Sequence, residues 1–385
     1  MPPLPQRRAG DVLRIKDRPL EFSFWPVERT TRRYGLGTRV FATDPWTVIR
    51  RSAERRCVTA TRSAAFALLE QAEDFYRAAS SGVKAAKPLL LYYCFMSLGK
   101  AFLIACRRHC DVNNAQHGLS EKLDPKIQKP VELINAYLNA YPSPNRGGQI
   151  QNFSELLEQF AETGVATNPF RYDLLKLLPQ IVPGHRLWVE GDGRHNTERF
   201  VSVEHIDFVQ NTESREIWLQ FYLMADDLRR IDITRENFLA RTRLGRQFRQ
   251  VDTQDVVNGR RLICFEQINP TAYTHRPSDE IPKVVASVRR FLWRTVLNTP
   301  PYRKYYLYAA PASEHLQVLP QVLSIYAIMF YLGSIVRYRP HCFDAILEAH
   351  YGPFIEAFLN DQPSQFIYLM ASEFAEKEVT KAAIV

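Results

Sequence analysis

Two cysteines, two histidines and two arginines lie close together in the segment FLIACRRHCDVNNAQHGL, residues 102–119. Side chains of these types can form a zinc site, since thiolates and imidazoles are zinc ligands. They can also form a nuclease site, in which histidine moves protons and arginine stabilises negative charge. A third interpretation is that the segment only ends a helix. The choice among the three decides most functional hypotheses for this chain.

The zinc hypothesis rests on spacing. Cys106, His109 and Cys110 are at positions i, i+3 and i+4, which places their side chains on one face of a helix. His117 follows a turn and can supply a fourth ligand, but three ligands on one helical face strain the tetrahedron that zinc prefers. Cys106 also continues an apolar face, as buried cysteines often do. We therefore predict no metal and no other cofactor, and keep these four residues as the alternative zinc ligands.

The helix-end interpretation explains the same residues more simply. Arg107 and Arg108 complement the dipole at a helix C-terminus, and the adjacent asparagines 113 and 114 tolerate a turn. The remaining alternative is a catalytic pair of Arg108 and His117. In that pair the imidazole would activate a ribose 2′-hydroxyl and the guanidinium would stabilise the charge on phosphorus.

Arginines elsewhere in the chain are candidates for contact with phosphate groups. The segment RTRLGRQFRQ (241–250) contains four arginines, and three of them recur every third position, near one face if the segment is helical. Two more lie before Pro340, where one predicted helix ends. The alternative is a solvated charged face that binds nothing. The candidate nucleic-acid ligands are Arg241, Arg243, Arg246, Arg249, Arg337 and Arg339.

The net charge of the chain also favours an anionic ligand. The 385-residue chain has 50 Lys and Arg against 41 Asp and Glu, a formal charge of +9, and residues 1–56 hold 13 of these bases and only 6 of the acids. A basic segment of this kind binds nucleic acid or anionic lipid, or is a solvated tail. The first residues have no apolar signal-peptide core, and six unevenly spaced cysteines indicate a reducing compartment. We expect a cytoplasmic protein.

The elements that must position these residues are predicted from periodicity. Apolar residues recur at helical spacing over residues 57–180 and 276–385, whereas segments such as EIWLQFYLM and RRLICFEQI alternate like strands. We predict a mainly α fold, a discontinuous helical bundle made of 57–180 and 276–385. A small antiparallel β-rich region, 181–275, is inserted into it (α+β overall), and residues 1–56 form a basic N-terminal arm.

Three segments carry finer predictions. RLWVE (186–190) is predicted to be a strand, and PVELINAYLNAY (130–141) and IPKVVASVRRFLWRTVLN (281–298) are predicted to be helices. The uncharged run from His315 to Val336 is about as long as a membrane span. Proline and glutamines interrupt it, so we predict a central core helix and no membrane association.

Both helical blocks resemble a known family. AAKPLLLYYCFMSLGKAFLIA with the following HGL, and LPQVLSIYAIMFYLGSIVRYRP with FIEAFLN and FIYLMASEF, are similar to segments of the YaaC-like family of uncharacterised bacterial proteins. The resemblance implies a mostly helical bacterial protein and supplies no catalytic residues.

A more distant resemblance links the first block to HEPN-type helical bundles, which would imply RNA-related or defence-linked work. Ribonucleases of that type carry an arginine followed, after four to six residues, by a histidine. In this chain only Arg199 and His205 have that spacing, in a strand-like segment.

These observations favour a non-catalytic protein that associates with RNA or DNA, or that binds a protein partner or a second copy of itself. The first alternative is a HEPN-like, metal-independent ribonuclease that uses Arg108 and His117. The second is a structural or assembly protein whose basic arm meets an anionic surface.

Overall fold

The computed structural model describes residues 3–15, 17–25, 39–82, 84–107, 115–161, 163–166, 168–191, 193, 197–297 and 303–382. The chain forms two compact units, each built from segments that are distant in sequence. The β-rich unit comprises residues 1–43, 197–315 and 376–385, and the helical unit comprises 44–196 and 316–375. These bounds differ from the predicted ones, since both ends of the chain belong with the central strands.

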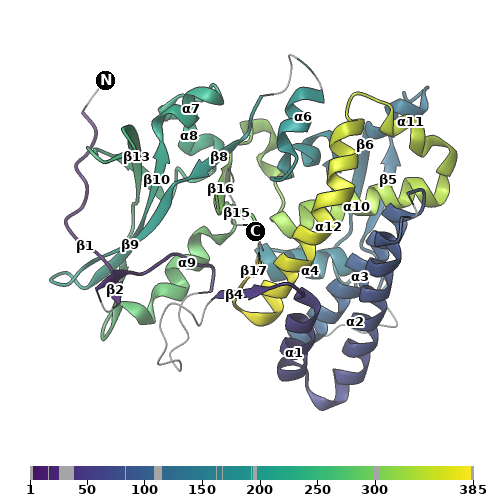
Figure 1. The fold of residues 1–385 in the computed structure, drawn as a ribbon, viewed down its shortest axis with the longest axis horizontal. Coiled ribbons are helices and arrows are strands. Elements are labelled where there is room, and N and C mark those ends of the chain that lie inside the picture. Colours follow the sequence, from purple (N-terminus) through teal and green to yellow (C-terminus); the bar gives the residue numbers. More distant parts are fainter. Residues whose placement is uncertain are drawn as a thin grey trace. The chain divides into compact units, whose positions relative to one another are not determined.

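A seven-stranded antiparallel sheet forms the centre of the β-rich unit (Figure 1). Its main path is β1-β9-β10-β13-β11, with β14 paired to β10 and β12 paired to β13. Eight of the nine residues of β10 are buried, so this strand is covered on both faces. The strands are β1 (Asp11–Val12), β9 (His205–Asn211), β10 (Glu216–Met224), β11 (Phe248–Val251), β12 (Val256–Val257), β13 (Arg260–Gln267) and β14 (Thr271–Ala272).

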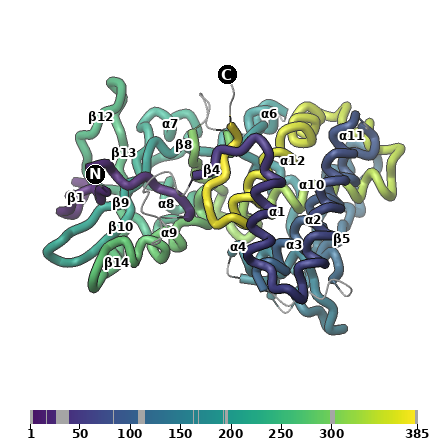
Figure 2. Tube along the Cα trace, turned by 60° about the horizontal axis from the view of Figure 1, so that its bottom comes forward, coloured from purple at the N-terminus to yellow at the C-terminus, as the bar shows by residue number. Residues whose placement is uncertain are grey.

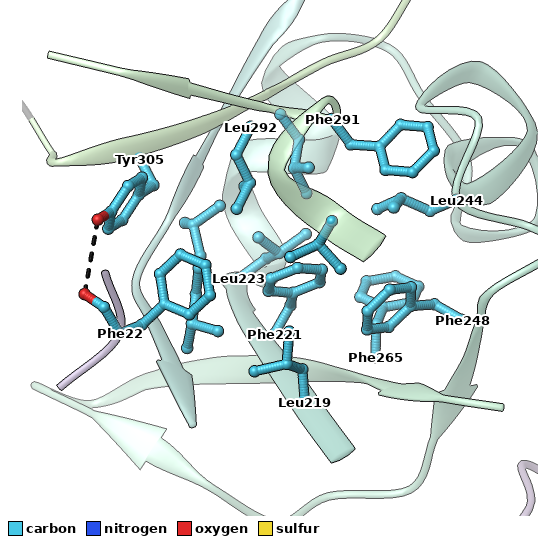
Figure 3. Packing of buried hydrophobic residues seen from close by; sticks show 14 of the residues in the cluster. Phe22, Leu219, Phe221, Leu223, Leu244, Phe248, Phe265, Phe291, Leu292 and Tyr305 are labelled. Atoms are coloured by element: carbon cyan, nitrogen blue, oxygen red, sulfur yellow. Dashed lines mark hydrogen bonds between the residues drawn. The ribbon is translucent and has the colours of Figure 1, made fainter. Parts of the chain in front are cut away.

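One face of this sheet carries the main hydrophobic core of the unit (Figure 3). Leu219, Phe221 and Leu223 point into it from β10, because alternate side chains of a strand lie on the same face. The rings of Phe221 and Phe248 stack with their centroids 4.7 Å apart. Helix α9 (Ile281–Arg289) covers the core with isoleucine and valine side chains spaced three and four residues apart.

Smaller β elements complete the unit. They are an antiparallel sheet in the order β15-β16-β8, the hairpin β2-β3 and the parallel pair β17-β4, which joins segments from near the two ends of the chain. Their bounds are β2 (Arg14–Ile15), β3 (Arg18–Pro19), β4 (Arg39–Ala42), β8 (Phe200–Val203), β15 (Leu292–Arg294), β16 (Tyr305–Tyr308) and β17 (Glu378–Lys381). The other helices are α7 (Ala225–Arg230), α8 (Arg235–Arg241) and the 3-10 turns η3 (Pro277–Asp279) and η4 (Ala312–Gln317).

The helical unit is organised around two nearly wholly apolar helices, α3 and α10, which pack together, and Figure 2 shows α1 beside the C-terminal helix α12. A three-stranded antiparallel sheet, β5-β6-β7, belongs to the same unit. The helices are α1 (Pro45–Arg56), α2 (Thr59–Ser80), α3 (Lys87–Ala105), α4 (Asn152–Ala161), α5 (Leu174–Leu177), α6 (His185–Gly191), α10 (Gln321–Tyr338), α11 (Phe343–Leu347) and α12 (Gly352–Ala375). The strands and 3-10 turns are β5 (Leu119–Leu123), β6 (Ala136–Ala140), β7 (Phe170–Asp173), η1 (Pro130–Ile134), η2 (Leu178–Gln180) and η5 (Pro340–Cys342).

Helices α3 and α10 are long and apolar enough to cross a membrane by length and composition alone. Within their most apolar windows, 72% of α3 and 78% of α10 is buried inside the fold. Burial of this extent is typical of core helices, which explains why both are apolar on almost every face.

The prediction of a mainly α bundle with a small β insertion is wrong. The fold is α+β, with 47% helix and 21% strand, and strands occur in both units. The seven-stranded sheet has its own core and recruits a strand from the N-terminal segment. Short strands such as β15 and β16 lie beside helical runs in sequence, and three or four residues are too few to show a period of two.

Several segments differ from their predicted form. RLWVE lies in helix α6, and the segment predicted as a helix at 130–141 is a 3-10 turn followed by strand β6. The helix predicted at 281–298 ends at Arg289 and continues as strand β15. Apolar runs of this length suit a buried strand and a buried helix equally, so tertiary packing decides between them.

The described part of the N-terminal segment is not an extended arm. Strand β1 pairs with β9, and Leu13 and Phe22 are buried in the core of the β-rich unit. Two of its arginines have protein partners. Arg7 pairs with Asp255 at 3.1 Å, and the Arg8 guanidinium donates to the Gln267 carbonyl. Residues 26–38 of the predicted arm lie outside the described part of the chain.

Candidate functional site

Two of the predicted nucleic-acid ligands, Arg241 and Arg243, lie where helix α8 ends in the β-rich unit. The Thr242 hydroxyl donates to the Phe238 carbonyl at 2.8 Å and closes the last turn. Leu244 is fully buried in the core, and Arg243 has a φ of +64°, so the chain reverses sharply around a buried leucine. The reversal leaves the Arg243 side chain exposed.

A third arginine joins them from the start of strand β8. Arg199 donates to the Tyr308 hydroxyl at 3.1 Å and to Glu314 at 2.6 Å, and both side chains of this ion pair are only 14% exposed. Arg241 reaches the same strand end, since its guanidinium donates to the Ala309 carbonyl at 3.4 Å. The loop after β16 therefore holds two arginines close together.

The electrostatics of these arginines are unusual. Burial lowers the pKa of Arg241, and the charge of Arg199 lowers it further. Arg243 is exposed as a whole residue, but partial burial of its guanidinium lowers its pKa, followed by the charge of Arg290. The Arg243 charge in turn lowers the pKa of His315, after burial. In each case burial is the first cause and a neighbouring positive charge is the second.

We call Arg199, Arg241, Arg243 and Arg290 the arginine cluster. Among the residues that the structure describes, the carboxylates whose charges favour Arg241 are those of Asp232 and Glu314. Arg199 and Arg241 both reach the loop after β16, and Arg243 and Arg290 are close enough for their charges to interact. Guanidinium groups bind phosphate through paired hydrogen bonds, so these arginines are a candidate anion site.

The structure does not bring the other predicted arginines of this segment to the same place. Arg246 is exposed in the turn after α8, and Arg249 lies on strand β11. The Arg249 guanidinium donates to the buried Glu266 at 3.0 Å, so its charge is neutralised. The segment 241–250 is a helix end, a turn and a strand, so the predicted helical face of three arginines does not form.

Arg337 and Arg339 lie in the helical unit, at the end of α10. Arg337 is exposed and donates to the Tyr93 hydroxyl at 3.3 Å. Arg339 lies 3.7 Å from the Glu121 carboxylate, so it has a protein partner for its charge. Of these two, Arg337 is the better placed to meet a ligand.

His117 is held in the helical unit by the chain on both sides of it. The next residue, Gly118, has a φ of +80°, and a Cβ there would lie 2.8 Å from the Phe153 nitrogen. Only glycine fits such a close approach. The His117 carbonyl accepts from the Phe153 N–H at 3.2 Å, so the first turn of α4 fixes the histidine backbone.

The imidazole of His117 begins a hydrogen-bonded chain that runs into the core. Its Nδ1 contacts the hydroxyl of Tyr92, a residue of α3 that is only 4% exposed. Tyr92 also hydrogen-bonds with Tyr326 of α10, whose hydroxyl accepts from the Asn152 amide at 3.2 Å. When Tyr92 donates to Tyr326, the Nδ1–H of His117 donates to Tyr92, and Nε2 is left with a lone pair that can accept a proton.

This environment keeps the histidine neutral. Burial lowers the pKa of His117, and the charges of Lys100 and Arg337 lower it further. Burial raises the pKa of Tyr92 well above its ordinary value, so the phenol stays protonated. A neutral, half-buried imidazole beside two cations is suited to accept a proton from a group carried by an anionic substrate.

The predicted catalytic partner of His117, Arg108, lies outside the described residues, as do the zinc candidates His109 and Cys110. Cys106 caps helix α3, and its thiol accepts from the Arg56 guanidinium at 3.5 Å. In the described part of the chain, no three His, Cys, Asp or Glu side chains come together as a metal site would require.

Sequence reasoning missed most of the residues that surround the two sites. Arg290 joins the arginine cluster from a helix end some 50 residues away in sequence, and Arg199 had been singled out only for its spacing to His205. Tyr92 and Asn152 have no distinguishing sequence pattern, because Tyr92 is one polar group in an apolar helix and Asn152 is at a helix start. Their role is visible only in the folded chain, where both hydrogen-bond with Tyr326.

Three comparisons with known proteins complete this description. A family model described as YaaC-like Protein matches residues 24–374. No curated protein matches the chain. No solved structure matches it either.

Proposed function

The chain belongs to the YaaC-like protein family, and from that starting point we propose that it is a non-catalytic protein that binds nucleic-acid phosphates through the arginine cluster. The observation that carries the proposal is geometric: Arg199 and Arg241 both reach the loop after β16, and the exposed Arg243 lies at the end of α8. After burial, the charge of a neighbouring arginine also lowers the pKa of Arg241 and of Arg243. Holding like charges together costs free energy, and an anionic ligand recovers that cost.

Two features favour a polyanion over a single phosphate. The guanidinium groups of the cluster come from the end of α8, the start of β8 and the end of α9, so successive phosphates can each find a partner. The chain also carries a formal charge of +9, which attracts polyanions from a distance.

The test is binding of labelled single-stranded RNA, single-stranded DNA and duplex DNA to the full chain, measured by fluorescence anisotropy across a salt series. We expect the double variant Arg241→Gln/Arg243→Gln to bind about tenfold more weakly than the native protein. For this variant, the slope of log affinity against log salt concentration should be smaller in magnitude by about one for each arginine removed.

A matched control is available in the same unit. Arg229 and Arg230 of α7 are 82% and 76% exposed at their side chains, and each pairs with an aspartate three residues earlier. Arg229→Gln/Arg230→Gln removes the same charge and should leave binding nearly unchanged. Equal losses in the two double variants, or no binding to any nucleic acid, would contradict the proposal and favour a protein partner instead.

A second candidate function rests on the His117 site. We propose as the alternative a metal-independent ribonuclease, in which His117 takes the proton from a ribose 2′-hydroxyl. The freed oxygen attacks the adjacent phosphorus, a 2′,3′-cyclic phosphate forms and the 5′-oxygen leaves with a proton. The neutral imidazole and the charges of Lys100 and Arg337 beside it support this step. The more distant relationship to HEPN-type bundles stays a prediction.

Cleavage of labelled RNA in the presence of a chelator tests this alternative. Activity that is present in the native chain and falls at least a hundredfold in His117→Ala would support it, since general acid–base catalysis contributes on the order of 10²–10⁴. Tyr92→Phe should shift the lower limb of the pH–rate profile, because it removes the partner of Nδ1. Cleavage that survives His117→Ala would exclude the assignment.

A further inference from the structure

A cavity of about 310 Å³ opens in the helical unit, and its lining includes none of the residues of the two sites described above. Its walls come from the end of α2, the start of α3, and helices α11 and α12. Ala79, Phe343 and Leu359 are each less than 7% exposed and form an apolar floor. The volume is at the lower end of the range for small-molecule sites, so any ligand is small.

The rim of this cavity is polar and carries charges of both signs. Lys84 and Glu356 pair across it at 3.2 Å, which leaves their charges balanced. Lys87 instead donates to the side-chain oxygen of Asn360 at 2.7 Å, a neutral partner. Among the described lining residues, two lysines therefore face one carboxylate. Asp361 contributes a further negative charge near Lys87 from outside the lining.

The position of Lys87 at a helix start favours an anion beside it. It is the first residue of α3, and the first turn of that helix contains no acidic residue. A cation at a helix N-terminus opposes the helix dipole, whereas a carboxylate there is stabilised by it. Burial also lowers the pKa of Lys87, although the charge of Asp361 opposes this shift. A ligand anion beside Lys87 would offset the unfavourable interaction with the helix dipole.

We propose that this cavity binds a small amphipathic monocarboxylate, such as a medium-chain fatty acid. Its hydrocarbon part packs on Phe343 and Leu359, and its carboxylate accepts from Lys87. The remaining lining residue of negative charge, Glu356, disfavours ligands with two negative charges. The apolar floor disfavours fully polar anions such as inorganic phosphate.

Isothermal titration of the full chain with octanoate, 1-octanol and octylammonium tests the proposal. We expect octanoate to bind at one saturable site and 1-octanol to bind about tenfold more weakly, because the alcohol lacks the charge-assisted hydrogen bond. Octylammonium should bind more weakly still. Absent saturation with octanoate, or tighter binding of octylammonium, would overturn the proposal.

Variants of the lining residues, with one control, assign the site. Lys87→Gln keeps a donor for Asn360 but removes the charge, so octanoate should bind it no better than octanol does. Lys126→Gln, at an exposed lysine of the same unit, is the matched control and should bind octanoate as the native chain does.

Leu347→Trp fills the cavity and should abolish binding of both ligands, and Ser80→Trp at the rim does the same if the first variant fails to fold. Unchanged octanoate affinity in Lys87→Gln would overturn the assignment. Because this cavity lies in the helical unit, none of these results depends on nucleic-acid binding by the arginine cluster.

Discussion

Glu266 illustrates how individual side chains decide which arginines are available to a ligand. Its carboxylate is fully buried in the sheet of the β-rich unit, where it accepts from Arg249 at 3.0 Å and from the Arg8 backbone N–H at 2.9 Å. The Gln220 amide donates to the same carboxylate at 3.2 Å. A buried carboxylate needs such partners, because an unpaired charge is costly in a low-dielectric interior. Arg249 is therefore a structural residue, whereas Arg243 forms no ion pair with a residue that the structure describes.

Replacing this carboxylate should destabilise the protein. We expect Glu266→Gln to lower the free energy of unfolding by roughly 1–3 kcal/mol, because the charge-assisted hydrogen bonds weaken while the donors stay buried. Urea unfolding followed by circular dichroism measures the effect as a lower midpoint. Glu213→Gln, at an exposed position, is the control, and equal midpoints for the two variants would refute the role of Glu266.

The lowered pKa of His117 has a consequence for stability. Its pKa in the folded chain lies below its value of about 6.5 in unfolded chains, so the unfolded state takes up the proton first as pH falls. Stability is therefore lost as pH falls through about 6.5 toward the folded pKa. An NMR titration should show an imidazole resonance, absent in His117→Gln, with a pKa below 6.5. That variant should also lose less stability than the native chain between pH 7.5 and 5.5. A folded pKa at or above 6.5 would contradict the described environment.

At the scale of elements, close approach of α3 and α10 builds the core of the helical unit and aligns Tyr92 with Tyr326. The approach depends on Gly333, where a Cβ would lie 3.0 Å from the Tyr92 Cβ and 3.3 Å from the Pro88 carbonyl oxygen. A small residue at a helix crossing lets two backbones come near each other. The hydrogen bonds that link His117, Tyr92 and Tyr326 thus depend on Gly333, which has no side chain to take part in them.

A larger side chain at this crossing should separate the helices. We expect Gly333→Val to destabilise the chain by roughly 1–3 kcal/mol, the usual cost of overpacking a core. Thermal unfolding measures the change, and Gly147→Val in an exposed loop serves as the control. Equal melting temperatures for the two variants would show that α3 and α10 do not pack as closely at Gly333 as described.

At the scale of the whole molecule, the family match extends over both compact units. It covers residues 24–374 and so includes segments of both compact units. The chain passes between the units four times, so neither unit is a continuous piece of sequence. Both units are therefore part of what defines the family.

The two apolar helices give a further prediction at this scale. Because most of α3 and α10 is buried by the fold itself, we expect the full chain to stay in the supernatant after high-speed centrifugation of a detergent-free lysate. Recovery in the membrane pellet, resistant to alkaline carbonate, would show that one of these helices spans a bilayer instead.

The sequence by itself determined the family resemblance and the long apolar helices. It also identified strands such as β10, because nine residues are enough to show a pattern. Tertiary structure decided whether the short elements are strands or helices. The sequences of segments such as 130–141 and 292–294 suit both, and the strands they pair with in the folded chain determine which one forms. Tertiary structure also decided which arginines are paired with a carboxylate: Arg249 and Arg243 look alike in sequence, but of these two it is Arg249 that meets Glu266. The physical reason is that periodicity is a local property, whereas burial and charge compensation depend on residues brought together from distant parts of the chain.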